Sequence, residues 1–159
     1  MLYELKNPKQ LEKETVNKLQ KDVFGKRSFI VFVHADWCGH CVRMLPEWNK
    51  FAEKAKNDAN FDIIDISSDS HSLLLSKKLP FISELLHKTV RGYPTIFMVS
   101  QSNSDSDEKM ESKVEFFEDE RTAGNLSKFV RKNLPKKGVS KNKKVESGLK
   151  SATSSKKSK

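Results

Sequence analysis

Both cysteines of the 159-residue chain lie in the segment ADWCGHCVRMLPEW, as Cys38 and Cys41. A disulfide between them would close a loop too short to restrict the unfolded chain, so it would add little stability. A structural zinc site needs four ligands, and the chain has no second cysteine pair; only His34 and His40 stand nearby. The spacing favours a redox centre. The two alternatives are that the pair is one half of a metal site and that it is a coincidence. The sequence therefore predicts no metal and no other cofactor.

A cysteine that opens a helix has a specific chemistry. If Cys38 begins a helix, its sulfur lies beside unpaired backbone N–H groups at the positive end of the helix dipole, and both lower its pKa. Cys41 would then lie on the same face, deeper and shielded, so Cys38 attacks a disulfide and Cys41 resolves the mixed disulfide. A partly protonated His40 would stabilise the Cys38 thiolate and make the disulfide a better oxidant. The alternative for His40 is an ordinary exposed helix residue.

Alternating strands and helices surround this segment. The apolar run SFIVFVHA (28–35) is typical of a central strand that helices bury on both faces. We expect further strands at 2–5, 61–67, 95–100 and 113–119, and a polar loop or hairpin end at 101–112. We expect one helix at 8–23, a second that begins directly after the cysteines, one or two at 68–88 with a break near Pro80, and a last one at 122–134. This order predicts an α/β fold with a mixed central β-sheet flanked by helices.

The charge of the chain is concentrated at its C-terminus. Residues 136–159 contain nine lysines and one acid, and they carry +8 of the net charge of +9. Such a segment cannot bury enough apolar surface to order itself, so we expect a domain at 1–135 and a disordered basic tail at 136–159. The tail has three interpretations: a solvated tail, an electrostatic contact with nucleic acid or acidic surfaces, or a nuclear-targeting signal. No aromatic side chains lie between the lysines, which argues against base stacking.

The N-terminal segment MLYELKNPKQLEKETVNKLQ is charged throughout and lacks an apolar run of the signal-peptide type. No stretch approaches the length of a transmembrane helix. We therefore expect a soluble protein of the cytoplasm. Thiols there are mostly reduced, so a close cysteine pair is catalytic more often than structural.

The segment FVHADWCGHCVRMLPEW resembles the active-site segment of the thioredoxin superfamily. Its tetrad CGHC resembles protein disulfide isomerase domains more than thioredoxins, which carry proline where His40 stands. VRGYPTI (90–96) resembles the second hallmark of the family, and FFEDERTAGNLSKFV (116–130) is similar to the ending of an isomerase domain. The resemblance covers residues 2–134 and implies a thioredoxin-like fold.

The resemblance also implies roles for individual residues. It implies a cis Pro94 that faces the cysteines, with an exposed backbone edge on which a substrate peptide pairs like an added strand. It implies that Arg121 swings toward Cys41 and eases its deprotonation. The site residues implied in this way are Cys38, Gly39, His40, Cys41 and Arg121 for catalysis, and Trp37, Tyr93 and Pro94 as an apolar rim for the substrate.

The chain departs from the family pattern at several positions. Phe32 stands where most members carry a buried Asp or Glu that is thought to shuttle a proton to the inner cysteine. Asp36 is near in sequence, and we expect it to be exposed. Val42 replaces a common lysine, and Asp119 replaces a usual glycine. Proton transfer is therefore expected to be slower, or to rely on Arg121 and solvent.

The sequence predicts a thiol–disulfide oxidoreductase of the protein disulfide isomerase type, which forms, reduces or rearranges disulfides in protein substrates. A redox partner that the sequence does not identify would recycle the pair. The alternatives are a cytosolic thioredoxin-like reductase and a thioredoxin-fold binding module with an electrostatic tail. Family members of the isomerase type normally occupy the endoplasmic reticulum, whereas a cytoplasmic, nuclear or cytoplasmic-virus setting suits a chain without a signal.

Overall fold

The computed structural model describes residues 1–11, 13–103 and 110–136. Its strands are β1 (Leu2–Leu5), β2 (Ser28–His34), β3 (Phe61–Ser67), β4 (Thr95–Asn103) and β5 (Met110–Phe116). Its helices are a short 3-10 helix, η1 (Pro8–Leu11), and α1 (Lys13–Asp22), α2 (Gly39–Ala55), α3 (Ser68–Lys77), α4 (Ile82–Thr89) and α5 (Ala123–Asn133). All but the first residue of the predicted basic tail lies outside the described residues.

The five strands form one mixed sheet in the order β1-β3-β2-β4-β5. The three strands β1, β3 and β2 run parallel, β4 runs antiparallel to β2, and β5 forms a hairpin with β4. Every residue of β2 is buried, as expected for a central strand covered on both faces. The predicted α/β fold with a mixed sheet flanked by helices is confirmed.

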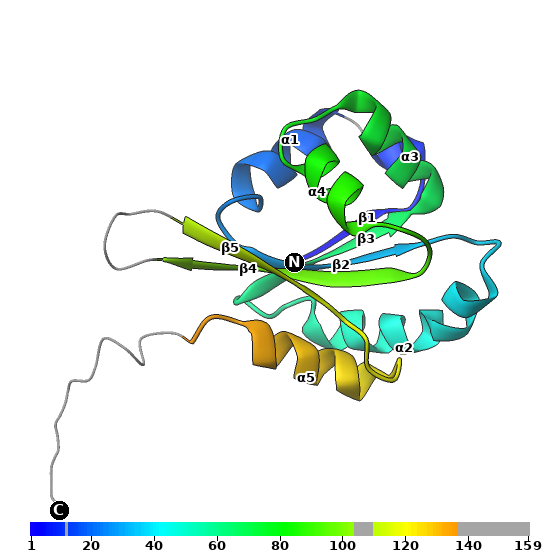
Figure 1. Ribbon diagram of the computed structural model, residues 1–159, viewed down its shortest axis with the longest axis vertical. Helices are drawn as coiled ribbons and strands as arrows, with labels where there is room; N and C mark the ends of the chain where they lie inside the picture. The colour runs from blue at the N-terminus through cyan, green and yellow to red at the C-terminus, as the bar shows by residue number, and fades with distance from the viewer. Residues whose placement is uncertain (12, 104–109, 137–159) are drawn as a thin grey trace, which may run out of the picture.

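Helices cover both faces of the sheet, as Figure 1 shows: α1, α3 and α4 lie on one side, and α2 and α5 on the other. The side chains of β2 alternate between two hydrophobic clusters. Phe29, Val31 and Val33 pack with the α1, α3 and α4 side, whereas Ile30 and Phe32 pack with α2 and α5. The even-numbered residues of β2 therefore face α2.

Two elements differ from the sequence prediction. The hairpin is longer than expected, because the β4–β5 ladder continues from Phe97–Phe116 to Asn103–Met110, into the segment predicted as a loop. Backbone pairing tolerates these polar residues because one face of the hairpin is open to solvent. The first predicted helix is divided into η1 and α1; the Asn7 side chain accepts a hydrogen bond from the backbone N–H of Lys9 at its start (3.0 Å).

Candidate active site

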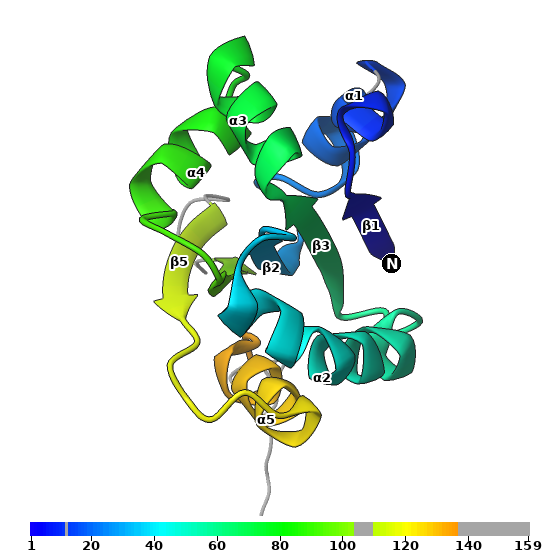
Figure 2. The same ribbon diagram turned by 90° about the vertical axis from the view of Figure 1, so that its right-hand side faces the viewer.

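The turn from β2 into α2 places Cys38 at the N-cap of α2 (Figure 2). Its backbone is extended, and its sulfur accepts a hydrogen bond from the backbone N–H of Cys41 at 3.3 Å. Both cysteines are free thiols. The sulfur of Cys38 therefore occupies the position that a serine or aspartate oxygen takes when it caps a helix.

The surroundings of Cys38 favour its thiolate. Burial raises the pKa of the thiol, but hydrogen bonds from the Cys41 thiol and from the backbone N–H groups of Cys41 and His40 outweigh that effect, together with the charge of Arg121. The net result is a pKa below the ordinary cysteine value. This is the environment of a reactive cysteine at a helix N-terminus.

Cys41 lies in the opposite environment. It is 2% exposed, and burial, followed by its hydrogen bond to Cys38, raises its pKa to about 11. The backbone of Ala35 and the charge of Arg121 act in the other direction. The two sulfurs thus differ in their readiness to ionise: Cys38 loses its proton more easily than Cys41.

The two residues between the cysteines are exposed. The ring of His40 lies against the next turn of the helix, where its Nδ1 accepts a hydrogen bond from the guanidinium of Arg43 at 2.9 Å. The backbone N–H of His40 lowers the pKa of Cys38. A Cβ at Gly39 would meet only the flexible end of Arg43, at 3.5 Å, so space does not require a glycine there.

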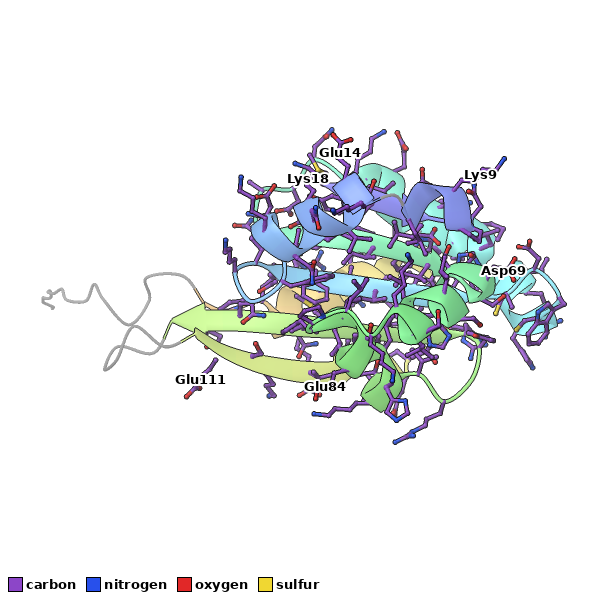
Figure 3. All side chains as sticks on the ribbon, turned by 90° about the horizontal axis from the view of Figure 1, so that it is seen from above. Lys9, Glu14, Lys18, Asp69, Glu84 and Glu111 are labelled. Carbon is purple, nitrogen blue, oxygen red and sulfur yellow. The ribbon has the colours of Figure 1, made fainter. Side chains whose placement is uncertain are left out.

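The segment before β4 faces Cys38. The peptide bond between Tyr93 and Pro94 is cis, and the Cys38 thiol donates to the backbone carbonyl of Tyr93 at 3.6 Å. The Tyr93 hydroxyl is 2.8 Å from Nδ1 of the buried His71 on α3. Burial, and then the charge of Asp69, raises the pKa of Tyr93; Asp69 lies at the end of the molecule where β2 turns into α2 (Figure 3).

Exposed apolar side chains lie close to Cys38 in the chain and in space. Trp37 is 76% exposed, Val42 is 54% exposed, and the ring of Trp37 meets the edge of Tyr93 at 5.7 Å between centroids. Trp37 and Tyr93 thus form a contiguous apolar surface, the kind of feature that marks an interaction site.

Arg121 approaches the cysteines from the segment between β5 and α5. Its charge lowers the pKa of both thiols, although the side chain is exposed. The segment is attached to α2 through Glu47, whose carboxylate accepts a hydrogen bond from the backbone N–H of Ala123 at 3.0 Å. Thr122 caps the start of α5 by accepting from the backbone N–H of Asn125.

A buried carboxylate lies near Phe32, and the sequence did not reveal it. Phe32 on β2 is the direct cross-strand partner of Asp65 on β3, and Asp65 is 1% exposed. Its Oδ1 is 2.5 Å from Nε2 of the buried His34, and its Oδ2 accepts a hydrogen bond from the indole N–H of Trp48 at 3.2 Å. Asp36 is exposed, as expected. Two aspartates occur in FDIIDIS, but only the register of β3 against β2 shows which one lies beside the site.

Within the described part of the chain, no group of three or more His, Cys, Asp or Glu side chains is arranged to hold a metal ion. Among the same residues, no helix combines the length and apolar character needed to cross a membrane.

Residues 9–132 match the model of the thioredoxin family, which corresponds to most of the chain. The chain belongs to the thioredoxin family. The described fold is similar to a solved structure, the Trx4 domain of ERdj5, at a TM-score of 0.50 and 11% identity, covering 83% of this chain and 96% of that domain.

The curated relatives are protein disulfide isomerases. The chain is 31% identical over 120 residues to a protein disulfide-isomerase of Ricinus communis, and 30% identical over 116 residues to the probable protein disulfide-isomerase A6 of Medicago sativa. These matches cover 74% and 73% of this chain but only 20% and 27% of the relatives. The chain therefore corresponds to one isomerase-type thioredoxin domain of proteins several times its matched length.

Proposed function

We propose that the chain is a thiol–disulfide oxidoreductase of the protein disulfide isomerase type, with protein thiols and disulfides as substrates. The observation that carries the proposal is the unequal pair of sulfurs: Cys38 with a lowered pKa at the N-terminus of α2, and Cys41 with a raised pKa beneath it. Similarity to protein disulfide isomerases supports the same conclusion.

In the proposed cycle, the Cys38 thiolate attacks a substrate disulfide, a mixed disulfide forms, and one substrate sulfur leaves. Cys41 then attacks Cys38, which releases the second substrate thiol and leaves a Cys38–Cys41 disulfide. In the reverse direction, the oxidised pair transfers its disulfide to a substrate dithiol. A redox partner then exchanges thiols and disulfides with the cysteine pair and restores its starting redox state.

The surface above Cys38 supports a role for peptide binding. Trp37 and Tyr93 form the apolar rim, and the segment at Pro94 enters β4 beside the sulfur. We propose that an extended substrate segment lies on this rim, with its disulfide over Cys38. Arg121 assists by its positive charge, which favours both thiolates.

Within this class we favour the oxidase and isomerase directions over the reductase. Stabilising the Cys38 thiolate stabilises the reduced form, and that makes the disulfide more oxidising. The compartment, the nucleic-acid contact of the basic tail and the identity of the recycling partner stay predictions.

The test is reactivation of a ribonuclease with scrambled disulfides by the full chain in a glutathione buffer. We expect the native chain to restore ribonuclease activity, Cys38→Ser to be inactive, and Cys41→Ser to accumulate a mixed disulfide with the substrate. Lys88→Ala, on the exposed face of α4, serves as the control and should match the native chain. Equal activity of Cys38→Ser and the native chain would refute the enzyme and leave the binding-module alternative.

A further inference from the structure

The proposed function leaves one proton without an acceptor. Cys41 must become a thiolate to attack Cys38, yet burial holds its pKa at about 11, so it is protonated at neutral pH. The ring of His40 in the same turn is exposed and lies along α2, where its Nδ1 accepts from Arg43. Three further groups near the pair are poor acceptors for this proton. In the mixed disulfide Cys38 is bonded, the guanidinium of Arg121 offers only donors, and the Tyr93 hydroxyl has a raised pKa and is engaged with His71.

A candidate proton acceptor lies in the sheet beneath Cys41. The backbone N–H of Ala35 lowers the pKa of Cys41, and Ala35 packs with both cysteines in one buried cluster. That N–H belongs to the peptide group that joins Ala35 to His34. His34 is therefore joined directly to the peptide group that influences the sulfur of Cys41.

The side chain of His34 lies on the face of the sheet that α2 covers. Its ring stacks on Phe32 at 4.4 Å between centroids, and Phe32 packs against Trp48 of α2 at 4.7 Å. Cys41, Met44 and Trp48 are buried residues at successive turns of α2. His34 thus occupies the layer between β2 and α2, at the end where Cys41 lies.

Asp65 holds this ring in a defined orientation. A carboxylate only accepts hydrogen bonds, so the 2.5 Å contact places a proton on Nε2 of His34 and leaves Nδ1 as the basic nitrogen. The second oxygen of Asp65 accepts from Trp48 and lies 3.9 Å from Nζ of Lys6, the other charged group that faces it. The Asp65 side chain is 2% exposed, so its charge is little screened by solvent.

We propose that His34, oriented by Asp65, is the proton acceptor for Cys41 in the resolving step, directly or through one water molecule. The inference rests on the proposed function, because only a resolving cysteine needs to lose its proton. Asp65 acts as a positioning residue, since it touches the imidazole and not the sulfur.

The proposed step conserves atoms and electrons. The Cys41 S–H bond breaks, its proton moves to Nδ1 of His34, and the imidazolium is stabilised by the Asp65 carboxylate. The Cys41 thiolate forms a bond to the Cys38 sulfur while the bond from Cys38 to the substrate sulfur breaks. The substrate leaves as a thiolate and takes up the proton that His34 held. His34 and Asp65 thereby return to their starting state, and the two cysteines are left as a disulfide.

The test separates the two sulfurs in a single turnover. Excess reduced protein is mixed with 5,5′-dithiobis(2-nitrobenzoate), whose leaving thiolate is coloured and needs no proton. Attack by Cys38 releases one coloured thiolate in a first phase, and attack by Cys41 releases another in a second phase. Four proteins are compared across neutral to alkaline pH: the native chain, His34→Gln, Asp65→Asn and the control Asp62→Asn.

The variants distinguish proton acceptance from structural support. Glutamine at position 34 keeps an N–H for Asp65 but accepts no proton, so the buried pair remains satisfied. Asp62 is a second buried carboxylate of β3 that pairs with Arg27 at 2.6 Å on the opposite face of the sheet. Asp62→Asn therefore reports the effect of losing a buried charge without touching the proposed acceptor.

We expect His34→Gln to slow the second phase at neutral pH by about 10²-fold, the usual contribution of a general base. Asp65→Asn should slow the same phase less, and Asp62→Asn should not slow it. The first phase should stay unchanged in all four proteins. The deficit of His34→Gln should shrink as the pH approaches 11, where Cys41 ionises without help.

Three results would overturn the inference. A second phase in His34→Gln that equals the native rate excludes the acceptor. A deficit of the same size at every pH indicates displaced structure instead of a lost base. Absence of the first phase in the native chain refutes the proposed function itself, and with it the need for an acceptor.

Discussion

Selective alkylation of Cys38 is the most direct consequence of the unequal sulfurs. A pKa of about 11 for Cys41 leaves about 10⁻⁴ of it as thiolate at pH 7. A cysteine with a pKa of 9.0 is about 1% thiolate at that pH, and the pKa of Cys38 lies below 9.0. The thiolate fractions therefore differ by at least about 10²-fold.

Nucleophilicity reduces this ratio but does not cancel it. A thiolate of lower pKa is a weaker nucleophile, with a Brønsted coefficient of about 0.4–0.5, which offsets about tenfold of the difference. We therefore expect Cys38 to react with iodoacetamide at least about tenfold faster than Cys41 at neutral pH. The deep burial of Cys41 acts in the same direction.

The assay is a short pulse of iodoacetamide on the reduced protein at a series of pH values, followed by peptide mapping by mass spectrometry. Mapping assigns the label to each cysteine without a substitution that would remove the hydrogen bond between them. The labelling rate of Cys38 should level off at a lower pH than that of an ordinary cysteine. The labelling rate of Cys41 should continue to rise up to about pH 11. Comparable labelling of both residues at neutral pH would refute the reasoning.

Three further predictions concern the surroundings of the pair. Arg121→Gln should raise the pKa of both thiols and slow alkylation of Cys38 at mildly acidic pH by about two- to threefold, because an exposed charge contributes at most about 1 kcal/mol; an unchanged rate would remove Arg121 from the site. Glu47→Ala should lower the urea midpoint of unfolding, because it frees the backbone N–H of Ala123 at the start of α5; a midpoint equal to that of the native chain would contradict this. Leu126→Ala, at a fully buried position of α5, should reduce the free energy of unfolding by about 3 kcal/mol in the same assay, and a loss below about 1 kcal/mol would show that α5 is loosely packed.

The thiol pair itself was predictable from sequence because its geometry is local. Cys38, Cys41 and the helix that begins between them lie within one turn, so spacing alone places one sulfur at the helix N-terminus and the other beneath it. The apolar run of β2 and the later helices fixed the fold class for a similar reason, since each periodicity is a property of a short segment.

The buried partners beneath the pair depend on long-range register and were not predictable. His34 and Asp65 are 31 residues apart, and they meet only because β2 and β3 run parallel with Phe32 opposite Asp65. A shift of one residue would turn Asp65 to the other face of the sheet. The contact between His71 and Tyr93 likewise depends on how α3 packs beside the turn into β4.

The redox potential of the Cys38–Cys41 pair tests the central claim most directly. The full chain is equilibrated in buffers of reduced and oxidised glutathione, quenched with acid, and the fraction of disulfide is measured by mass spectrometry. A stabilised Cys38 thiolate predicts a potential near −180 mV, as for protein disulfide isomerase. A value near −270 mV, as for thioredoxin, would make the chain a reductant, and a pair that forms no disulfide in any buffer would contradict the enzyme altogether.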